Sequence, residues 1–215
     1  MSQDRITAII LAGGQGKRLD GRDKASIELD GITLLDRRVS LLKSLCSEII
    51  VVSNESYTAG GVGYRLVGDR ERDVGPLMAL YSGLAGSNTR KNFVTACDMP
   101  FLVEGLFNSL KAYSDSYDAV IPRIGSFFEP LFAFYSRECM DAIEKMLMQS
   151  RRRIASFFNR IKIRFVEEEE IRHHDSALLS FFNINTSEDL RKARSLASEH
   201  RELPNTFAGS KQSTD

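Results

Sequence analysis

Short apolar runs and helix-like apolar repeats alternate along the chain. The run 6–11 is rich in β-branched residues and nearly free of polar ones, as expected for a buried strand. Between 33 and 46, apolar residues recur every three or four positions, which is the spacing of one helical face. Further along the chain, these two patterns predict strands at 49–52, 64–67, 92–97, 118–122, 129–135 and 161–166 and helices from 76, at 103–113, at 137–148, around 154–158 and from 187.

The order of these elements predicts an α/β fold. Strands that alternate with helices form a mainly parallel sheet, and ligands bind at the carboxyl ends of its strands. Polar or glycine-rich segments directly follow several predicted strands, so we expect them to converge on one crevice. These segments are the loop 12–18, Ser53-Asn54, Asp69 and Asp98.

The composition is that of one ordinary globular domain. The 215 residues suffice for one sizeable core, and 42% hydrophobic and 27% charged residues are typical of globular proteins. We expect a single domain over residues 1–198. The pattern dissolves beyond it, which predicts a mobile tail over 199–215.

Charge and cysteine content exclude several functions. Lys+Arg and Asp+Glu both number 29, so the chain has no bulk attraction to nucleic acid or to membranes, and any anion site must be local. The three cysteines lie far apart in the sequence, which argues against a disulfide framework and a zinc site and fits a reducing compartment. The sequence contains neither a signal peptide nor a membrane-spanning stretch, so we expect a cytoplasmic protein.

The most informative stretch is Leu11-Ala-Gly-Gly-Gln-Gly-Lys-Arg18, which continues to Asp23-Lys24. A strand that ends in a glycine-rich turn exposes backbone N–H groups, and these bind phosphate oxygens. The loop lacks the Gly-Lys-Ser/Thr end of a Walker P-loop, and Leu19 breaks the dinucleotide fingerprint Gly-x-Gly-x-x-Gly. A flexible turn with solvated cations is the plainer interpretation, but Arg18 and Lys24 favour a site for a polyphosphate.

Asp98 ends an apolar strand and is expected beside this loop. Its carboxylate could hold Mg²⁺, which binds one or two carboxylates together with phosphate oxygens. On its own, a cap for the helix that follows Pro100 is the plainer interpretation, since Asp is common at such positions. Asp69 and Asp73 leave the same choice open between a functional role and a cap. Either could cap the helix that starts at Gly75-Pro76.

Two amides, Asn183 and Asn185, flank Ile184 late in the chain. In an extended segment both would project from one face and could bind a polar heterocycle. Turn amides before the last helix are an equally good explanation. Thr186 or Ser187 is the expected N-cap of that helix.

Charged runs elsewhere have plainer explanations. The basic run 151–153 could meet the anionic end of a second substrate or form a solvated helix start. The acidic run 167–170 and His173-His174 are interpreted as solvated surface.

Taken together, these segments resemble a known family. The loop 11–18 with Asp23-Lys24 resembles the signature loop of sugar-nucleotide-type nucleotidyltransferases. The resemblance covers about residues 6–197. The loop alone is specific only to the superfamily, whereas the loop together with Cys97-Asp-Met-Pro100 and Asn183-Ile-Asn-Thr186 is much more specific. Four further segments occur in the order and rough spacing of the molybdenum cofactor guanylyltransferases, the MobA family: Asp73-Val-Gly-Pro-Leu77, Cys97-Asp-Met-Pro100, Glu129-Pro-Leu-Phe132 and Phe182-Asn-Ile-Asn-Thr186.

The resemblance implies a Rossmann-like, three-layer nucleotidyltransferase fold with a mainly parallel, mixed central sheet. It implies transfer of GMP from GTP to the terminal phosphate of molybdopterin, with release of pyrophosphate and a requirement for Mg²⁺. GTP and molybdopterin are then the small-molecule partners. Proteins of molybdenum cofactor biosynthesis and acceptor molybdoenzymes are further expected partners, and neither a nucleic acid nor a membrane is.

The resemblance also implies roles for individual residues. Lys24 would contact the α-phosphate, Asp98 would hold the metal, and Asn183 and Asn185 would face the pterin. The catalytic residues would be Arg18, Lys24 and Asp98. Residues 14–18 would surround the phosphates, and Leu11 to Gly13 would lie beside the base and ribose. The nucleotide-binding set would be Leu11, Ala12, Gly13, Gly14, Gly16, Lys24, Asn54, Asp69 and Asp98, with Ser53 as the alternative to Asn54.

The chain departs from the family pattern at two places. Leu19-Asp20 stands where Met-Gly is usual, and the added carboxylate lies close to the phosphate path, where it could weaken GTP binding. Met78-Ala79 replaces Leu-Ala, and Leu80 stands where glycine is common, which bears on the shape of the guanine pocket.

Several alternatives stay open. A molybdopterin cytidylyltransferase, or a nucleotidyltransferase for a sugar or alcohol phosphate, would use the same residues, and the sequence does not separate guanine from cytosine. A non-catalytic nucleotide-binding regulator would be marked by the loss of Lys24 or Asp98, and both are present. A nucleic-acid-binding module is disfavoured by the zero net charge and by the lack of a basic and aromatic cluster.

Overall fold

The fold is built on one central sheet flanked by helices. A computed structural model describes residues 5–12, 18–19, 22–55, 57, 63–70 and 74–201, with only the backbone of Arg18, Arg22, His200 and Arg201. Two small hairpins lie apart from the sheet: β2 (Arg18–Leu19) with β3 (Arg22–Asp23), and β4 (Glu28–Leu29) with β5 (Ile32–Thr33). The strands of the central sheet are β1 (Ile6–Leu11), β6 (Glu48–Val52), β7 (Arg65–Val67), β8 (Lys91–Ala96), β9 (Ala119–Ile124), β10 (Phe127–Phe128), β11 (Phe132–Ser136) and β12 (Ile163–Glu167).

The sheet is mixed and mainly parallel, as predicted. Its strand order is β10-β9-β11-β8-β1-β6-β7, and β12 pairs with β9. β1 is parallel to both β6 and β8, β7 is parallel to β6, and β12 is parallel to β9. β11 is antiparallel to both β8 and β9, so those two strands run in the same direction. The carboxyl ends of β1, β6, β7, β8, β9 and β12 therefore lie along one edge of the sheet.

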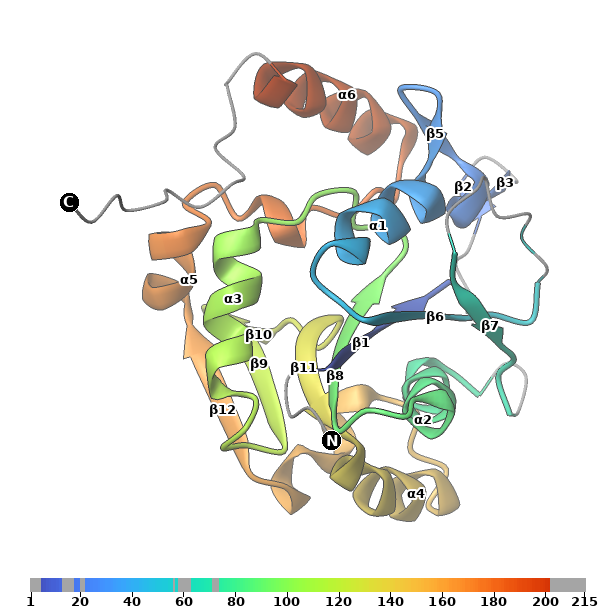
Figure 1. Ribbon diagram of the computed structural model, residues 1–215, viewed down its shortest axis with the longest axis vertical. Helices are drawn as coiled ribbons and strands as arrows, with labels where there is room; N and C mark the ends of the chain where they lie inside the picture. Colours follow the sequence, from blue (N-terminus) through green and yellow to red (C-terminus); the bar gives the residue numbers. More distant parts are fainter. Residues whose placement is uncertain are drawn as a thin grey trace.

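Helices cover both faces of the sheet and complete three layers (Figure 1). α1 and α3 lie on one face, and α2 and α4 lie on the other. The α-helices of the described chain are α1 (Leu34–Lys43), α2 (Pro76–Gly86), α3 (Glu104–Tyr113), α4 (Met140–Met148), α5 (Glu168–His174) and α6 (Ser187–Arg201). Its short 3₁₀ helices are η1 (Lys24–Ser26), η2 (Arg137–Cys139), η3 (Ile154–Arg160) and η4 (Leu179–Phe181).

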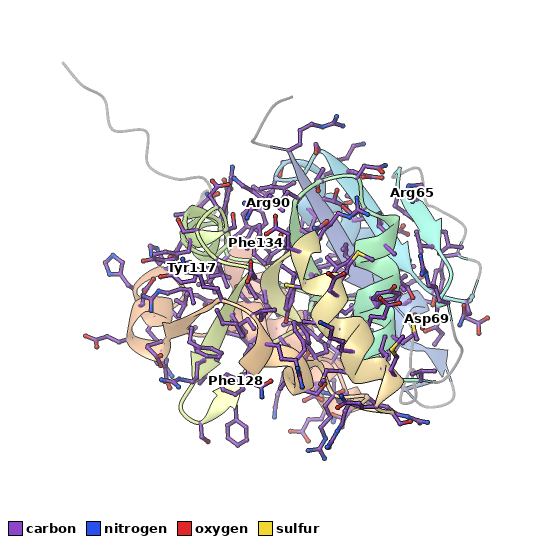
Figure 2. All side chains as sticks on the ribbon, turned by 90° about the horizontal axis from the view of Figure 1, so that it is seen from below. Arg65, Asp69, Arg90, Tyr117, Phe128 and Phe134 are labelled. Carbon is purple, nitrogen blue, oxygen red and sulfur yellow. The ribbon has the colours of Figure 1, made fainter. Side chains whose placement is uncertain are left out.

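The apolar pattern of β1 explains why both faces are covered. Ala8 and Ile10 point into the core beneath α1 and α3, whereas Ile9 and Leu11 point into the core beneath α2 and α4. Every side chain of β1 is buried, because side chains alternate between the two faces of a strand and both faces are packed. Figure 2 likewise shows Phe134 of β11 in the interior of the molecule and Phe128 of β10 at its rim.

Some elements differ from those expected. The acidic run 167–170 is not simply solvated surface, since Glu168 to Glu170 form the first turn of α5 and Glu167, Glu168 and Glu170 form ion pairs with arginines. Carboxylates stabilise this helix because they are favourable at a helix N-terminus. The sequence did not predict the helix, because a helix that buries only one side chain, Ile171, shows no apolar periodicity. The strand expected at 129–135 begins only at Phe132, because the Phe132 N–H closes a turn onto the Glu129 carbonyl at 3.2 Å.

The C-terminal helix is capped as expected. The Asp189 N–H donates to Thr186 Oγ1 at 3.1 Å, and the Thr186 N–H donates back to the Asp189 carboxylate at 2.8 Å. Thr186, rather than Ser187, is therefore the N-cap. α6 continues to Arg201, slightly beyond the expected start of the tail, and the rest of that segment, 202–215, lies outside the described residues. No helix within the described ranges has the length and apolar character needed to cross a membrane.

Gly83 of α2 lies so close to the sheet that we expect Gly83→Ala to destabilise the protein by about 1–3 kcal/mol. A Cβ at this position would lie 2.4 Å from Ile9 Cγ2 and 3.1 Å from Val52 Cγ2. Alanine has the better helix propensity by about 1 kcal/mol, so a loss would come from the overlap alone. Urea unfolding measures the change.

Gly86→Ala in the last turn of the same helix is the control. Its Cβ would lie 3.0 Å from Val67 Cγ2 near the sheet edge, where the neighbour can shift, so the expected loss is smaller. If Gly83→Ala were as stable as the wild type, α2 would not be packed against β1 as closely as described.

Candidate active site

Lys24 is the centre of the candidate site. It opens η1 immediately after Asp23, whose carboxylate accepts the Ala25 N–H at 3.2 Å and so caps the turn. The Lys24 side chain is largely buried, although lysine is rarely found inside a protein without a partner. The short turn therefore fixes a cation in the interior rather than leaving it in solvent.

The partners of Lys24 come from distant parts of the chain. Its Nζ donates to Asp98 Oδ2 at 2.9 Å and to Asn185 Oδ1 at 2.5 Å, across 74 and 161 residues of sequence. Asp98 follows the carboxyl end of β8, and Asn185 precedes α6. The Ile184 N–H donates to the Asp98 carbonyl at 2.9 Å, which holds the two segments together. The structure thus brings three of the predicted site residues into direct contact.

The contacts leave binding capacity unused. An ammonium group has three N–H donors, and only two of those on Lys24 have acceptors among the described residues. Asp98 Oδ1 takes part in no hydrogen bond with the described chain, and this side chain is 19% exposed. One donor and one carboxylate oxygen at the same point could therefore meet an anion and a cation together.

Asn54 and Asp69 meet at the neighbouring strand ends. Asn54 Oδ1 accepts the Asp69 N–H at 3.0 Å, which joins the loops after β6 and β7. Ser53 is buried, its hydroxyl accepts the Glu55 N–H at 3.0 Å, and its N–H donates to the Val67 carbonyl. Of the two candidates for this position, Asn54 is thus the less buried. Figure 2 shows Arg65 and Asp69 at opposite ends of the β7 edge.

The start of the glycine loop is fixed at the carboxyl end of β1. Leu11 and Ala12 are buried; the Leu11 carbonyl accepts the Cys97 N–H at 3.2 Å and the Ala12 N–H donates to the Val52 carbonyl at 3.0 Å. Gly13, predicted beside the base and ribose, and the predicted phosphate-binding glycines Gly14 and Gly16 lie outside the described residues, as do Asp20 and Asp73. The backbone of Arg18 pairs with Asp23 in the β2–β3 hairpin, whereas its side chain is not described.

Asn183 does not share the contacts of Asn185. Its Nδ2 donates to the Phe181 carbonyl at 2.9 Å, which turns the amide toward its own backbone. Asn185 instead reaches Lys24. Ile184 between them is fully buried, so the side chains on either side of it face the surface as an extended segment requires.

Tyr57 is a site residue that the sequence did not reveal. Its hydroxyl oxygen lies 2.8 Å from Asp23 Oδ2 and 3.1 Å from the Ala12 carbonyl oxygen, so it joins the glycine loop to the turn that carries Lys24. Burial raises the pKa of this phenol, and the neighbouring Asp23 carboxylate adds to the rise, so the hydroxyl keeps its proton at neutral pH. Nothing in the residues around position 57 signals this contact, because both partners are distant in sequence.

Arg38 also escaped the sequence analysis, although a signal was present. It lies three residues after Leu35 and four before Leu42, so it occupies the apolar face of α1. A charged residue at a core position is a mark of special use. Its side chain is fully buried and reaches the β8–α3 loop that carries Asp98.

The site is compatible with a magnesium ion that binds together with a nucleotide. The described residues contain no group of three or more His, Cys, Asp or Glu side chains that could hold a metal ion alone. Mg²⁺ in nucleotide enzymes is held by one or two carboxylates together with the substrate phosphates. The partly exposed Asp98 carboxylate is a suitable oxygen ligand of this kind.

Comparisons with known proteins place the chain in a family. The family model for the MobA-like NTP transferase domain matches residues 8–164. The molybdenum cofactor guanylyltransferase of Desulfosudis oleivorans is 37% identical over 191 residues, which are 88% of this chain and 95% of that protein. A probable molybdenum cofactor guanylyltransferase of Pelotomaculum thermopropionicum is 35% identical over 197 residues, 92% of this chain and 96% of that protein.

Solved structures extend the agreement to the fold. Molybdopterin-guanine dinucleotide biosynthesis protein A from Archaeoglobus fulgidus matches with a TM-score of 0.75 and 26% identity, over 90% of this chain and 99% of that one. A 2-C-methyl-D-erythritol 4-phosphate cytidylyltransferase from Thermus thermophilus matches with a TM-score of 0.66 over 89% of this chain and 98% of that one; at 15% identity it shows the nucleotidyltransferase fold alone. The resemblance seen in the sequence is thereby confirmed, and the chain belongs to the MobA-like NTP transferase family that includes the molybdenum cofactor guanylyltransferases.

Proposed function

We propose that the protein transfers GMP from GTP to the terminal phosphate of molybdopterin and releases pyrophosphate. The observation that carries the proposal is the buried Lys24 ammonium between Asp98 and Asn185, at the carboxyl edge of the sheet. Lys24 thereby joins Asp98, which is expected to bind the nucleotide through the metal, to Asn185, which is expected to bind the second substrate. The names of the relatives favour this reaction over cytidylyl transfer and over a purely regulatory role.

The reaction needs alignment more than covalent help. A phosphate oxygen of molybdopterin forms a bond to the α-phosphorus of GTP while the bond from that phosphorus to the bridging oxygen of pyrophosphate breaks. The leaving oxygen takes the electron pair, and the attacking phosphate is already ionised, so no general base is required. The barrier comes from charge repulsion and from the in-line geometry.

Lys24 is placed to reduce the charge repulsion. Its unused N–H donor would bind the α-phosphate, where negative charge is concentrated as the two oxygens exchange. A cation that is already buried and oriented needs little reorganisation when the substrate arrives. Asp23 and Tyr57 hold the turn that carries it.

Mg²⁺ is the proposed cofactor, and Asp98 is the residue that would hold it. When bound, the ion would neutralise phosphate charge and bridge the nucleotide to the protein. Lys24 at present donates to Asp98 Oδ2, so this carboxylate would exchange or share its ammonium partner when the nucleotide binds. Arg18 would contribute a further positive charge at the phosphates.

The remaining roles follow the strand ends. Leu11, Ala12 and Gly13 would line the base and ribose, and Gly14 and Gly16 would present N–H groups to the phosphates. Asn54 would help hold the nucleotide together with Asp69, which it already contacts. Asn185 would turn from Lys24 to the pterin, with Asn183 beside it.

A thermal shift experiment with four nucleotides tests the proposal. GTP with Mg²⁺ at a hundredfold excess over its dissociation constant is expected to raise the free energy of unfolding by about 2.7 kcal/mol. For a chain of this length that corresponds to roughly 5–10 °C in Tm. CTP, ATP and UTP at the same concentration serve as controls and should shift the midpoint much less. An equal or larger shift with CTP would contradict the guanylyl assignment.

A further inference from the structure

We propose that Arg38 is a positioning residue, which holds the Asp98 loop from inside the protein and keeps the Asp98 carboxylate in place for the metal-bound nucleotide. The inference rests on the proposed function, because it takes Asp98 as the metal ligand. It assigns a role to a side chain that touches no substrate and that neither the strand-end pattern nor the family motifs point to.

Arg38 is bonded to both sides of the segment that carries Asp98. Its Nη1 donates to the Phe101 carbonyl at 2.7 Å, and its Nη2 donates to Thr95 Oγ1. Thr95 lies at the carboxyl end of β8, and Phe101 lies in the loop before α3. One rigid, planar guanidinium therefore spans the chain from three residues before Asp98 to three residues after it.

α1 supports the same loop a second time. Arg37, the neighbour of Arg38, donates from Nε to the Pro100 carbonyl at 3.2 Å. On the other side of the loop, the Asp98 carbonyl accepts the Ile184 N–H at 2.9 Å. The Asp98 loop is thus held from the helix layer and from the C-terminal segment, while its carboxylate stays available to Lys24.

Stability alone does not explain a charge at this position. Arg38 is fully buried, its guanidinium lies 5.6 Å from the centre of the Phe132 ring, and it makes no ion pair with a described carboxylate. Its Nε has no hydrogen-bond partner in the described part of the chain. Burying an ion with incomplete pairing is unfavourable, and apolar residues of similar volume at such sites are often as stable or more stable. Both side-chain hydrogen bonds of this buried cation go to the segment around Asp98, so we attribute its presence to holding that segment.

The charge itself acts on Asp98. Burial lowers the pKa of Arg38 to about 9, so the guanidinium remains a cation at neutral pH, and Asp98 is the charged neighbour that most opposes this shift. This attraction adds to the hydrogen bonds that Arg38 makes on both sides of Asp98. A metal ligand must be correctly oriented, and Arg38 supports this by fixing the segment on both sides of Asp98.

The test uses Arg38→Met, which removes the charge and both hydrogen bonds but keeps an apolar volume. We expect Tm to fall by several degrees, because the Phe101 carbonyl and the Thr95 hydroxyl lose their donor, and GTP affinity without metal to stay within about threefold. We expect kcat to fall by about ten- to a hundredfold, because the Asp98 loop is no longer fixed. Calorimetry should show that the gain in GTP affinity on adding Mg²⁺ is largely lost. Arg38→Lys, which keeps the charge, should recover part of that gain.

Controls separate this inference from the proposed function. Arg90→Met, the same change at an arginine that pairs with Glu138 at the amino edge of the sheet, is expected to alter the Mg²⁺-linked gain by less than about threefold. If wild-type GTP binding does not respond to Mg²⁺, the proposed metal site itself is wrong. If it responds and folded Arg38→Met responds equally, the role of Arg38 is refuted. Should Arg38→Met not fold, Thr95→Val removes one acceptor of the guanidinium; an undiminished gain in that variant would refute it as well.

Discussion

Replacing Lys24 with methionine is expected to lower GMP transfer by about a hundred- to a thousandfold while the protein remains folded. Methionine fills a similar volume but cannot donate to Asp98, to Asn185 or to a phosphate. The loss should therefore appear mainly in kcat, because charge develops around the α-phosphate only as the reaction proceeds. Steady-state kinetics with GTP and molybdopterin measures the rate, and circular dichroism confirms the fold.

The chain supplies a matched control for this change. Lys91 is also a buried lysine paired with an aspartate, with its Nζ 2.7 Å from Asp115 Oδ2. It opens β8, so it lies at the amino edge of the sheet, opposite the candidate site. Lys91→Met is expected to change stability but not the turnover of folded protein. Near-normal transfer by Lys24→Met would show that the reaction does not depend on this ammonium group.

Replacing Asp98 with asparagine is expected to have a comparable effect through the metal. The amide keeps the shape and can still accept a hydrogen bond from Lys24, but it lacks the negative charge that Mg²⁺ needs in its ligand. We expect transfer to fall by about a thousandfold and the remaining activity to need far more Mg²⁺. A Mg²⁺ titration at saturating GTP measures both effects.

Asp115→Asn is the corresponding control, since Asp115 pairs with Lys91 and no described contact links it to the candidate site. It should leave the Mg²⁺ titration unchanged. If Asp98→Asn responded to Mg²⁺ as the wild type does, Asp98 would not be the metal ligand. Lys24 would then have to stabilise the phosphates without that carboxylate.

The fold could be predicted wherever burial imposes a period on the sequence. β1 and β6 are apolar at all but one position because the sheet is covered on both faces, and α3 shows its buried face through Leu106, Phe107 and Leu110. α5 escaped prediction because it buries one side chain and is held by ion pairs and a favourable N-terminal charge. Elements stabilised by charge leave no apolar pattern.

The site was predictable only where topology alone gathers residues. Asp98 and Asn54 could be placed together in advance, because both follow parallel strands and the carboxyl ends of such strands share an edge. The contact between Lys24 and Asn185 was not derivable in this way, since Asn185 follows no strand of the parallel set. Tyr57 was missed for a similar reason, because one of its partners is a backbone carbonyl, which every residue carries and no sequence marks. Arg38 is visible in the sequence as a charge on the apolar face of α1, but its carbonyl partner at Phe101 is not.

The distance in sequence between Lys24 and Asn185 has a consequence for the newly made protein. The two residues are separated by 161 positions, and chains are synthesised at about 5–20 residues per second, so Lys24 waits on the order of ten seconds for its amide partner. During that time the sheet strands β1, β6 and β8 are already available for pairing, whereas the segment that closes over Asp98 is still missing. A nascent chain can therefore build its scaffold early, but it becomes a complete catalyst only when almost the last of its described residues has left the ribosome.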